Sequence, residues 1–201
     1  MLNTEDAILV RRSIRHYAPE FAIPEHDINK LLQLALHTPT SFNIQHERIV
    51  RVTDVAQRER LKAAAWNQEH ISTASEVWII CADIQAWQKT PERYWRNVDE
   101  PTRSTILPML DDFYRGKPQL QRDEALRTCG MVAQTVMLAA AAMGYGSCPM
   151  IGFDADEVAR LINLPEDHLI GMIVTLGKSV QPENPRSGPL AVEEVITHNH
   201  F

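Results

Sequence analysis

Basic side chains are concentrated near the N-terminus, in the run RRSIR at residues 11–15. Guanidinium groups are planar, keep their charge and match the geometry of phosphate oxygens, and a serine hydroxyl adds a compact donor. The run therefore indicates an anion-binding segment. The alternative is a solvated helix end, because helical periodicity covers residues 4–10 and cations near a helix C-terminus complement its dipole.

A second polar stretch, TPTSFNIQ at residues 38–45, is dense in hydroxyl and amide groups. Such residues are ordinary in turns. The same groups offer donors and acceptors together, which suits the edge of a heterocycle with alternating carbonyl and N–H groups. A further polar cluster, WNQEH, follows at residues 66–70. The eight histidines show no HxxxH or HxH spacing on an apolar face, so we expect no metal site.

A glycine-containing stretch, GYGSCPMIGF at residues 144–153, superficially matches a dinucleotide-binding fingerprint. It follows a predicted helix instead of a strand, and Pro149 stands where the third glycine belongs, so that interpretation fails. Gly152 lacks a Cβ and would let backbone N–H groups approach a flat ligand closely.

The elements that must position these residues fit one domain spanning residues 1–201. Three runs predict strands: 47–53, 77–82 and 169–177, the last two apolar on both faces and therefore internal. Capping signals at Asp54 and Asp154 predict helices over 54–65 and 154–162. A helix beginning near Glu25 has one apolar face, whereas residues 129–143 are apolar nearly all round and predict a buried helix. Residues 192–196 could form a short terminal strand.

Residues 87–123 differ from the rest because aromatic and charged residues alternate with prolines. The segment is too long for a plain connection, so we expect short helices that form a flap over a site. The alternative is a surface excursion with its own small core.

Composition excludes several classes of partner. A net charge of −6 gives no general attraction to nucleic acid. No signal peptide or run long enough to span a bilayer is visible, residues 128–144 coming nearest, so we expect no membrane partner. The cysteines at positions 81, 129 and 148 are widely spaced, which fits core residues of a protein in the reducing cytoplasm.

The order of the motifs is more specific than any one of them. RRSIR is followed by PTSFNIQ, then GYGSCPMIGFD, LPED and a strand ending LGK. The chain, from about residue 5 to the C-terminus, resembles the nitroreductase family of flavin mononucleotide (FMN) enzymes. The resemblance implies an α+β fold with a central, mostly antiparallel sheet flanked by helices. It also implies an intertwined homodimer with FMN in two interface clefts, and a tail at about 179–201 that embraces the partner.

The resemblance assigns roles within residues 11–15. Arg11 and Ser13 would hold the FMN phosphate, Arg12 would lie beside the ring system, and Arg15 would lie near the flavin N1 and O2 atoms. Residues of the strand-ending and tail segments would add phosphate contacts: Lys178 and Arg186. A cation such as Arg15 would stabilise the negative charge that reduction leaves at N1 and O2.

Further cofactor contacts are implied at three other places. The second subunit would supply Pro39, Thr40, Ser41 and Asn43. Asn67 would face the pyrimidine edge of the flavin. Backbone N–H groups facing N5 and O4 would come from the segment Pro149, Met150, Ile151 and Gly152. No catalytic side chain is required, because the flavin N5 carries the chemistry.

The implied activity is that of an FMN-dependent oxidoreductase working by ping-pong, with NAD(P)H as donor and nitroaromatics, quinones or related small molecules as acceptors. Aromatic residues of the flap, Trp95, Phe113 and Tyr114, would stack over the open flavin face. Three alternatives stay open on the sequence: reduction of an enal, enone or aldehyde on the same fold, a flavin-binding protein with little turnover, and a colourless anion-binding module.

Overall fold

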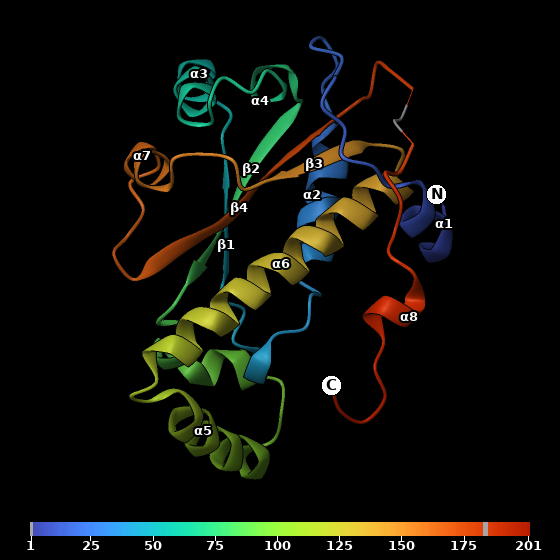
Figure 1. Cartoon of the computed structure of the whole chain (residues 1–201). Coiled ribbons are helices and arrows are strands. Elements are labelled where there is room, and N and C mark those ends of the chain that lie inside the picture. Colours follow the sequence, from blue (N-terminus) through green and yellow to red (C-terminus); the bar gives the residue numbers. More distant parts are fainter. Residues whose placement is uncertain (1, 183–184) are drawn as a thin grey trace.

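The computed structural model describes residues 2–182 and 185–201, and its centre is a four-stranded sheet (Figure 1). The strand order is β1-β2-β4-β3, and every neighbouring pair is antiparallel. The strands are β1 (Glu47–Arg51), β2 (Glu76–Asp83), β3 (Gly146–Met150) and β4 (His168–Gly177). The expected α+β fold with an antiparallel central sheet is confirmed.

The inner strand β2 is buried along its whole length, as its apolar sequence predicts. Alternate side chains of a strand point to opposite faces. Trp78 and Ile80 therefore belong to a core shared with α2 (Glu25–Ala35) and α6 (Pro118–Ala142). Ile79 and Cys81 belong to a second core on the other face, with α3 (Val55–Ala64) and α7 (Ala155–Leu161). The result is a sheet covered by helices on both sides.

Aspartates begin two of the covering helices, as the sequence predicts. The Asp54 carboxylate accepts a hydrogen bond of 2.7 Å from the Gln57 backbone N–H at the start of α3. Asp154 accepts one of 2.9 Å from the Glu157 N–H at the start of α7. The chain also forms two further short helices: α1 (Thr4–Val10), which precedes the sheet, and α4 (His70–Thr73), which lies between α3 and β2 in the sequence.

Helix α6 crosses the sheet as the central helix of the fold (Figure 1). It begins at Pro118, eleven residues before the predicted start at 129. Among the described residues it is the helix that is long and apolar enough to cross a membrane, but its apolar positions pack against the sheet. Its place in the core accounts for that composition. Helix α6 packs closely against β4 at Gly171, since a Cβ on that residue would lie 2.3 Å from the Cβ of Cys129 in the helix.

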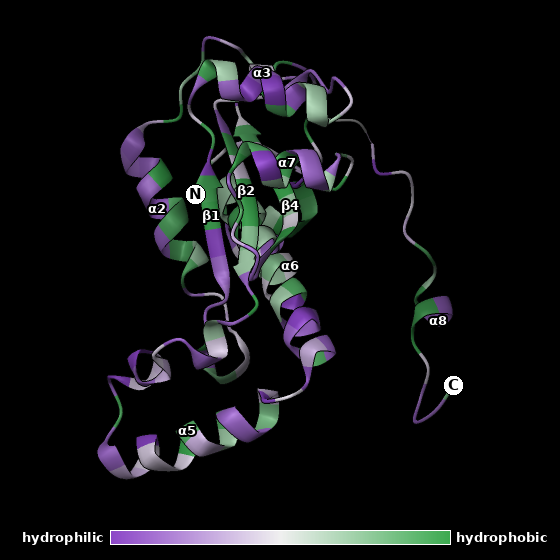
Figure 2. Cartoon of the chain, turned by 90° about the vertical axis from the view of Figure 1, so that its left-hand side faces the viewer, coloured by the Kyte–Doolittle hydropathy of each residue, from purple (hydrophilic) through white to green (hydrophobic). Residues whose placement is uncertain are grey.

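The segment predicted to be a flap or a surface excursion, here called the flap, consists of short helical segments, as expected, followed by a longer helix. The elements are η2 (Ala86–Gln88), η3 (Pro91–Trp95) and α5 (Glu100–Tyr114), and residues 118–123 belong to α6 instead of the flap. These elements enclose a small core that includes Trp87, Tyr94 and Tyr114. Figure 2 shows α5 at the end of the molecule remote from α3.

The C-terminal tail leaves the body of the molecule as an extended segment (Figures 1 and 2). The predicted terminal strand at 192–196 is wrong, because the structure has a short helix there, α8 (Val192–Val195). The Glu194 carboxylate accepts a hydrogen bond of 3.2 Å from the Ala191 backbone N–H, and acidic residues stabilise the first turn of a helix. Residues 183–184 of the tail lie outside the described part of the chain.

Candidate functional site

Residues 11–15, here called the anchor segment, run alongside strand β3. Ser13 forms a parallel bridge with Ser147, and the Ile14 N–H donates to the Ser147 carbonyl oxygen at 2.9 Å. Gly146 permits this approach, because a Cβ there would lie 2.8 Å from the Ile14 side chain. Helix α1 ends at Val10. The segment therefore follows directly on the end of α1 and is held against the sheet edge.

Five cations that the sequence singles out converge around the anchor segment. A cavity of about 450 Å³ is lined by Arg11, Arg12, Arg15 and Arg186, together with Ser13. Arg186 is held there by its Nη2, which donates to the carbonyl oxygens of Ile8 at 2.9 Å and Arg11 at 3.2 Å. The tail arginine thus reaches back over the end of α1.

Lys178 lies in an adjoining cavity of about 440 Å³ that Arg11 and Arg12 also line. Segment 178–180 is fixed beside the residues that follow the anchor, since the Ala18 N–H donates to the Lys178 carbonyl oxygen at 2.9 Å. In residues 2–182 and 185–201, none of the five cations forms an ion pair with a carboxylate. The concentrated positive charge is therefore available to an anionic ligand.

Arg12 is placed differently from its neighbours. Its Nη1 donates to the carbonyl oxygens of Leu9 at 2.7 Å and Arg11 at 3.0 Å, which satisfies carbonyls at the end of α1. Its Nε is buried and has no hydrogen-bond partner among the described residues. A buried donor without a partner costs stability, so Arg12 retains one group suited to a bound acceptor.

Arg15 lies beside two buried side chains, Cys148 and His70. Burial raises the pKa of the Cys148 thiol, and Arg15 opposes that rise. Burial lowers the pKa of His70, and the charges of Arg15 and His16 lower it further. His70 Nε2 lies 3.0 Å from Met150 Sδ. His70 is therefore neutral at pH 7, and the positive charge at this point comes from Arg15.

The predicted residues Asn67 and Gly152 lie on two turns that meet. Trp66 and Asn67 both have left-handed backbone conformations, with φ of 55° and 59°, which cost energy in residues other than glycine and occur where the surrounding structure enforces them. Gln68 Nε2 donates to the Gly152 carbonyl oxygen at 2.8 Å. A Cβ on Gly152 would lie 3.1 Å from the Trp66 ring. The turn at Asn67 is thus braced against the segment that follows β3.

The remaining residues of that segment have unequal exposure. Pro149 and Met150 are strand residues of β3, whereas Ile151 is 79% exposed beyond it. Two neighbours that shape this region were not predicted as site residues: Gln68, which the sequence placed in a polar cluster, and Cys148, which it placed in the core. Their positions follow from the left-handed turn and from the docking of the anchor on β3, neither of which leaves a pattern in the sequence.

The loop containing Pro39, Thr40, Ser41 and Asn43 lies apart from the anchor segment within the chain. It forms the short helix η1 (Ser41–Asn43), and Asn43 Nδ2 donates to the Tyr94 carbonyl oxygen in the flap at 2.7 Å. The N-terminal segment instead contacts the far end of α6, where the Leu2 N–H donates to the Ala142 carbonyl oxygen (Figure 1). The predicted site is therefore divided between two regions of the molecule.

The three flap aromatics have different surroundings. Phe113 is 40% exposed and its ring lies 5.5 Å from that of Phe42 in η1. Trp95 is partly buried against the small core of the flap. Tyr114 has no exposed surface, so its predicted role in stacking over a ligand is wrong. Its ring stacks on Trp87 at 6.1 Å and stabilises the flap from within.

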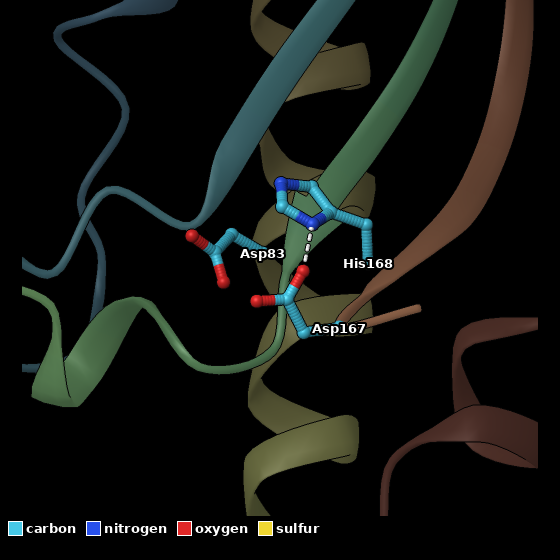
Figure 3. Close-up of side chains that lie close together, drawn as sticks. All are labelled: Asp83, Asp167 and His168. Atoms are coloured by element: carbon cyan, nitrogen blue, oxygen red, sulfur yellow. Dashed lines mark hydrogen bonds and ion pairs between the residues drawn. The ribbon is translucent and has the colours of Figure 1, made fainter. Parts of the chain in front are cut away.

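One acidic cluster, Asp83, Asp167 and His168, has the composition of a possible cation site (Figure 3). Lys89 already supplies a positive charge to it, with Nζ at 2.8 Å from Asp83 and 2.6 Å from Asp167. Lys89 and His168 together hold the pKa of Asp167 below its usual value. The cluster is thus an ion-pair network that joins the end of β2 to the start of β4.

The chain belongs to the nitroreductase family, whose sequence model matches residues 8–178. Protein DrgA of Synechocystis sp. is 44% identical over 180 residues, covering 90% of this chain and 86% of DrgA. The NADPH-flavin oxidoreductase of Vibrio harveyi is 30% identical over 204 residues, covering 100% of this chain and 75% of that protein. The crystal structure of ydfN from Bacillus subtilis superposes with a TM-score of 0.90 at 31% identity, covering 96% of this chain and 97% of that one.

Proposed function

We propose that the protein is an FMN-dependent oxidoreductase that uses NAD(P)H to reduce nitroaromatics, quinones or related small oxidised molecules. The observation that carries the proposal is the convergence of Arg11, Arg15 and Arg186, without carboxylate partners among the described residues, around one cavity beside Ser13. The name of the Vibrio harveyi relative, an NADPH-flavin oxidoreductase, supports both the cofactor and the donor.

The residues present fit FMN in charge and in hydrogen-bond donors. Arg11, Ser13 and Arg186 would hold the phosphate, with Lys178 on the adjoining side. The buried Arg12 Nε offers a further donor. When bound, FMN supplies a carrier that accepts two electrons from NAD(P)H and passes them to the acceptor. The protein's own contribution is to bind and orient the cofactor and to place positive charge beside it. Arg15 places a fixed cation beside Cys148, where it would favour the negative charge of the reduced flavin.

We further propose that a homodimer completes the site. The loop of residues 39–43 lies apart from the anchor segment in one chain, so a second copy would bring the two together. Exposed apolar side chains of the tail support this assembly: Leu190, Val192, Val195 and Ile196. Apolar surface gathered on a segment that leaves the body indicates an interaction site. We propose a cytoplasmic location on the same basis as the sequence, since Cys81, Cys129 and Cys148 are buried and free.

The visible spectrum of the purified protein, recorded before and after NADPH, tests the proposal directly. We expect flavin absorption that bleaches under anaerobic NADPH and returns when a quinone is added. Stable colour that NADPH leaves unchanged would indicate a flavin-binding protein with little turnover. A colourless protein that does not take up added FMN would overturn the proposal.

A further inference from the structure

A second basic cavity lies at the base of the flap, where it shares Asn43 with the loop of residues 39–43 but none of the cations of the anchor segment. Its volume is about 620 Å³, which is within the range of small-ligand sites. Arg48, Arg93 and Arg96 line it, together with the amide side chains of Asn43 and Gln45. No carboxylate is among the described residues that line it. Such a surface is unexpected on a chain with a net charge of −6.

The three guanidinium groups differ in how far they are already paired with carboxylates or other acceptors of the protein. Arg48 lies 3.5 Å from Asp83, which Lys89 also pairs, and its Nη1 donates to the Gln45 carbonyl oxygen at 3.0 Å. Arg93 lies over the Tyr94 ring at 4.7 Å and donates to the Tyr94 hydroxyl at 2.6 Å. In the described part of the chain neither Arg93 nor Arg96 forms an ion pair.

Arg93 lies in the short helical turn η3, and Arg96 directly follows it. The turn η3 follows Thr90, which has a left-handed φ of 53°. Tyr94 is buried at its centre and donates its hydroxyl to the Ala86 carbonyl oxygen at 3.0 Å. Asn43 Nδ2 binds the Tyr94 carbonyl oxygen at 2.7 Å and ties the turn to η1. The backbone that carries Arg93 and Arg96 is therefore already ordered before a ligand binds, which lowers the cost of binding.

We propose that this cavity binds an oxyanion, a phosphate or a carboxylate, carried by a reactant of the flavin. Guanidinium and amide donors without competing carboxylates are suited to that chemistry. The inference rests on the proposed function through Asn43, which lines the cavity and also belongs to the loop that would complete the FMN cleft of a second copy. A reactant lying over the flavin could then place its anionic end among the arginines.

Calorimetric titration of the FMN-loaded protein with two probes tests the inference without turnover. Adenosine 2′,5′-bisphosphate represents the phosphates of the donor, and benzene-1,3-dicarboxylate represents an acidic acceptor. The test variant is Arg93→Gln/Arg96→Gln. The control, Arg60→Gln, removes an exposed guanidinium from α3, remote from the flap. We expect the dissociation constant of at least one probe to rise about tenfold or more in the test variant, and to be unchanged in the control.

The outcomes separate the two sources of the anion and the two proposals. Weaker binding of the bisphosphate alone assigns the cavity to the donor, and weaker binding of the dicarboxylate alone assigns it to the acceptor. Equal affinities in wild type and the double variant, or no binding of either probe, overturn the inference while flavin bleaching by NADPH stands. A colourless protein that takes up no FMN would overturn the proposed function, and titration of that protein without FMN would then show separately whether the arginines bind either probe.

Discussion

At the scale of single residues, Arg15 differs from the other cations of the anchor segment in its surroundings. Arg11 and Arg186 belong to the cavity proposed for phosphate, whereas Arg15 also lies beside Cys148 and His70, the latter neutral at pH 7. The proposed function therefore divides phosphate binding, by Arg11 and Arg186, from redox tuning, by Arg15. The division makes the contribution of each arginine separately measurable.

Arg15→Ala is expected to weaken FMN binding about tenfold, because one charge-assisted interaction is lost. The midpoint potential of the bound flavin should fall as well, since a fixed positive charge favours the reduced form. Fluorescence titration gives the dissociation constant, and redox titration gives the potential. Arg122→Ala, on the exposed side of α6, is the matched control. Unchanged affinity and potential in Arg15→Ala would contradict its assigned role.

A second residue-scale prediction concerns His46, which has no exposed surface and lies 3.2 Å from the Thr128 hydroxyl through Nδ1. Burial lowers its pKa to about 4, while Asp83 opposes and Arg48 adds to the shift. Between pH 6.5 and 4 the unfolded chain binds a proton that the folded chain does not. Above pH 6.5, neutral His46 therefore does not lower the free energy of unfolding. As the pH falls below that value, protonation of the unfolded chain lowers the free energy of unfolding, by about 3 kcal/mol at most.

Urea unfolding at pH 7.5 and pH 4.5 measures this dependence in wild type and in His46→Gln. We expect the variant to lose less stability on acidification than wild type does. Glu47, whose pKa burial raises, changes stability in the opposite sense, and the difference between the two proteins removes its contribution. His198→Gln in the exposed tail is the control. Equal losses in wild type and His46→Gln would show that His46 titrates normally.

At the scale of elements, the contact between α6 and β4 depends on the absence of a side chain. Gly171→Ala would place a Cβ 2.3 Å from the Cβ of Cys129 and 3.3 Å from the Ile80 carbonyl oxygen. Overpacking of this kind costs about 1–3 kcal/mol, so the thermal midpoint should fall by several degrees. The control is Gly130→Ala on α6, where a Cβ meets nothing within 4 Å.

The two glycine variants are expected to change stability in opposite directions. Alanine is favoured over glycine inside a helix by about 0.5–1 kcal/mol, so Gly130→Ala should raise the thermal midpoint slightly. Differential scanning calorimetry compares both with wild type. A thermal midpoint of Gly171→Ala at or above that of wild type would mean that α6 can move away from β4 without a loss of stability.

Elements whose signals are local could be predicted from the sequence. Strand β2 is apolar on both faces, and Asp54 and Asp154 indicate the starts of the helices that they cap. The first turns of α6 are polar and gave no apolar periodicity, although Pro118 suits a helix start. The β-branched residues of 192–196 favoured a strand, but a strand needs a partner, and the described structure offers none there.

The candidate site was less predictable because its parts are distant in the sequence. Residue types identified the anchor segment, but its docking on β3 requires Gly146, and Arg186 reaches it from the other end of the chain. The second basic cavity also depends on tertiary structure, since η3 is folded back against the loop at Asn43. Only the order of motifs, compared with a known family, grouped the cofactor residues.

At the scale of the whole molecule, the proposed dimer would depend on the exposed apolar side chains of the tail. Leu190 and Val195 are 68% and 61% exposed, on a segment that extends away from the domain (Figure 2). Burying such a side chain contributes about 1.5–3 kcal/mol, and a symmetric dimer would bury each of them twice. Burial of these side chains in the proposed dimer would therefore contribute to its stability.

Leu190→Asp/Val195→Asp is expected to shift the protein from dimer to monomer in size-exclusion chromatography with light scattering, because four charged side chains would replace apolar ones across the dimer. FMN should dissociate more readily from the monomer, since the loop of residues 39–43 would no longer reach the anchor segment of another copy. Val55→Asp, which charges a residue 74% exposed on α3, controls for added charge. A double variant that stays dimeric and retains FMN would show that the tail does not hold the assembly.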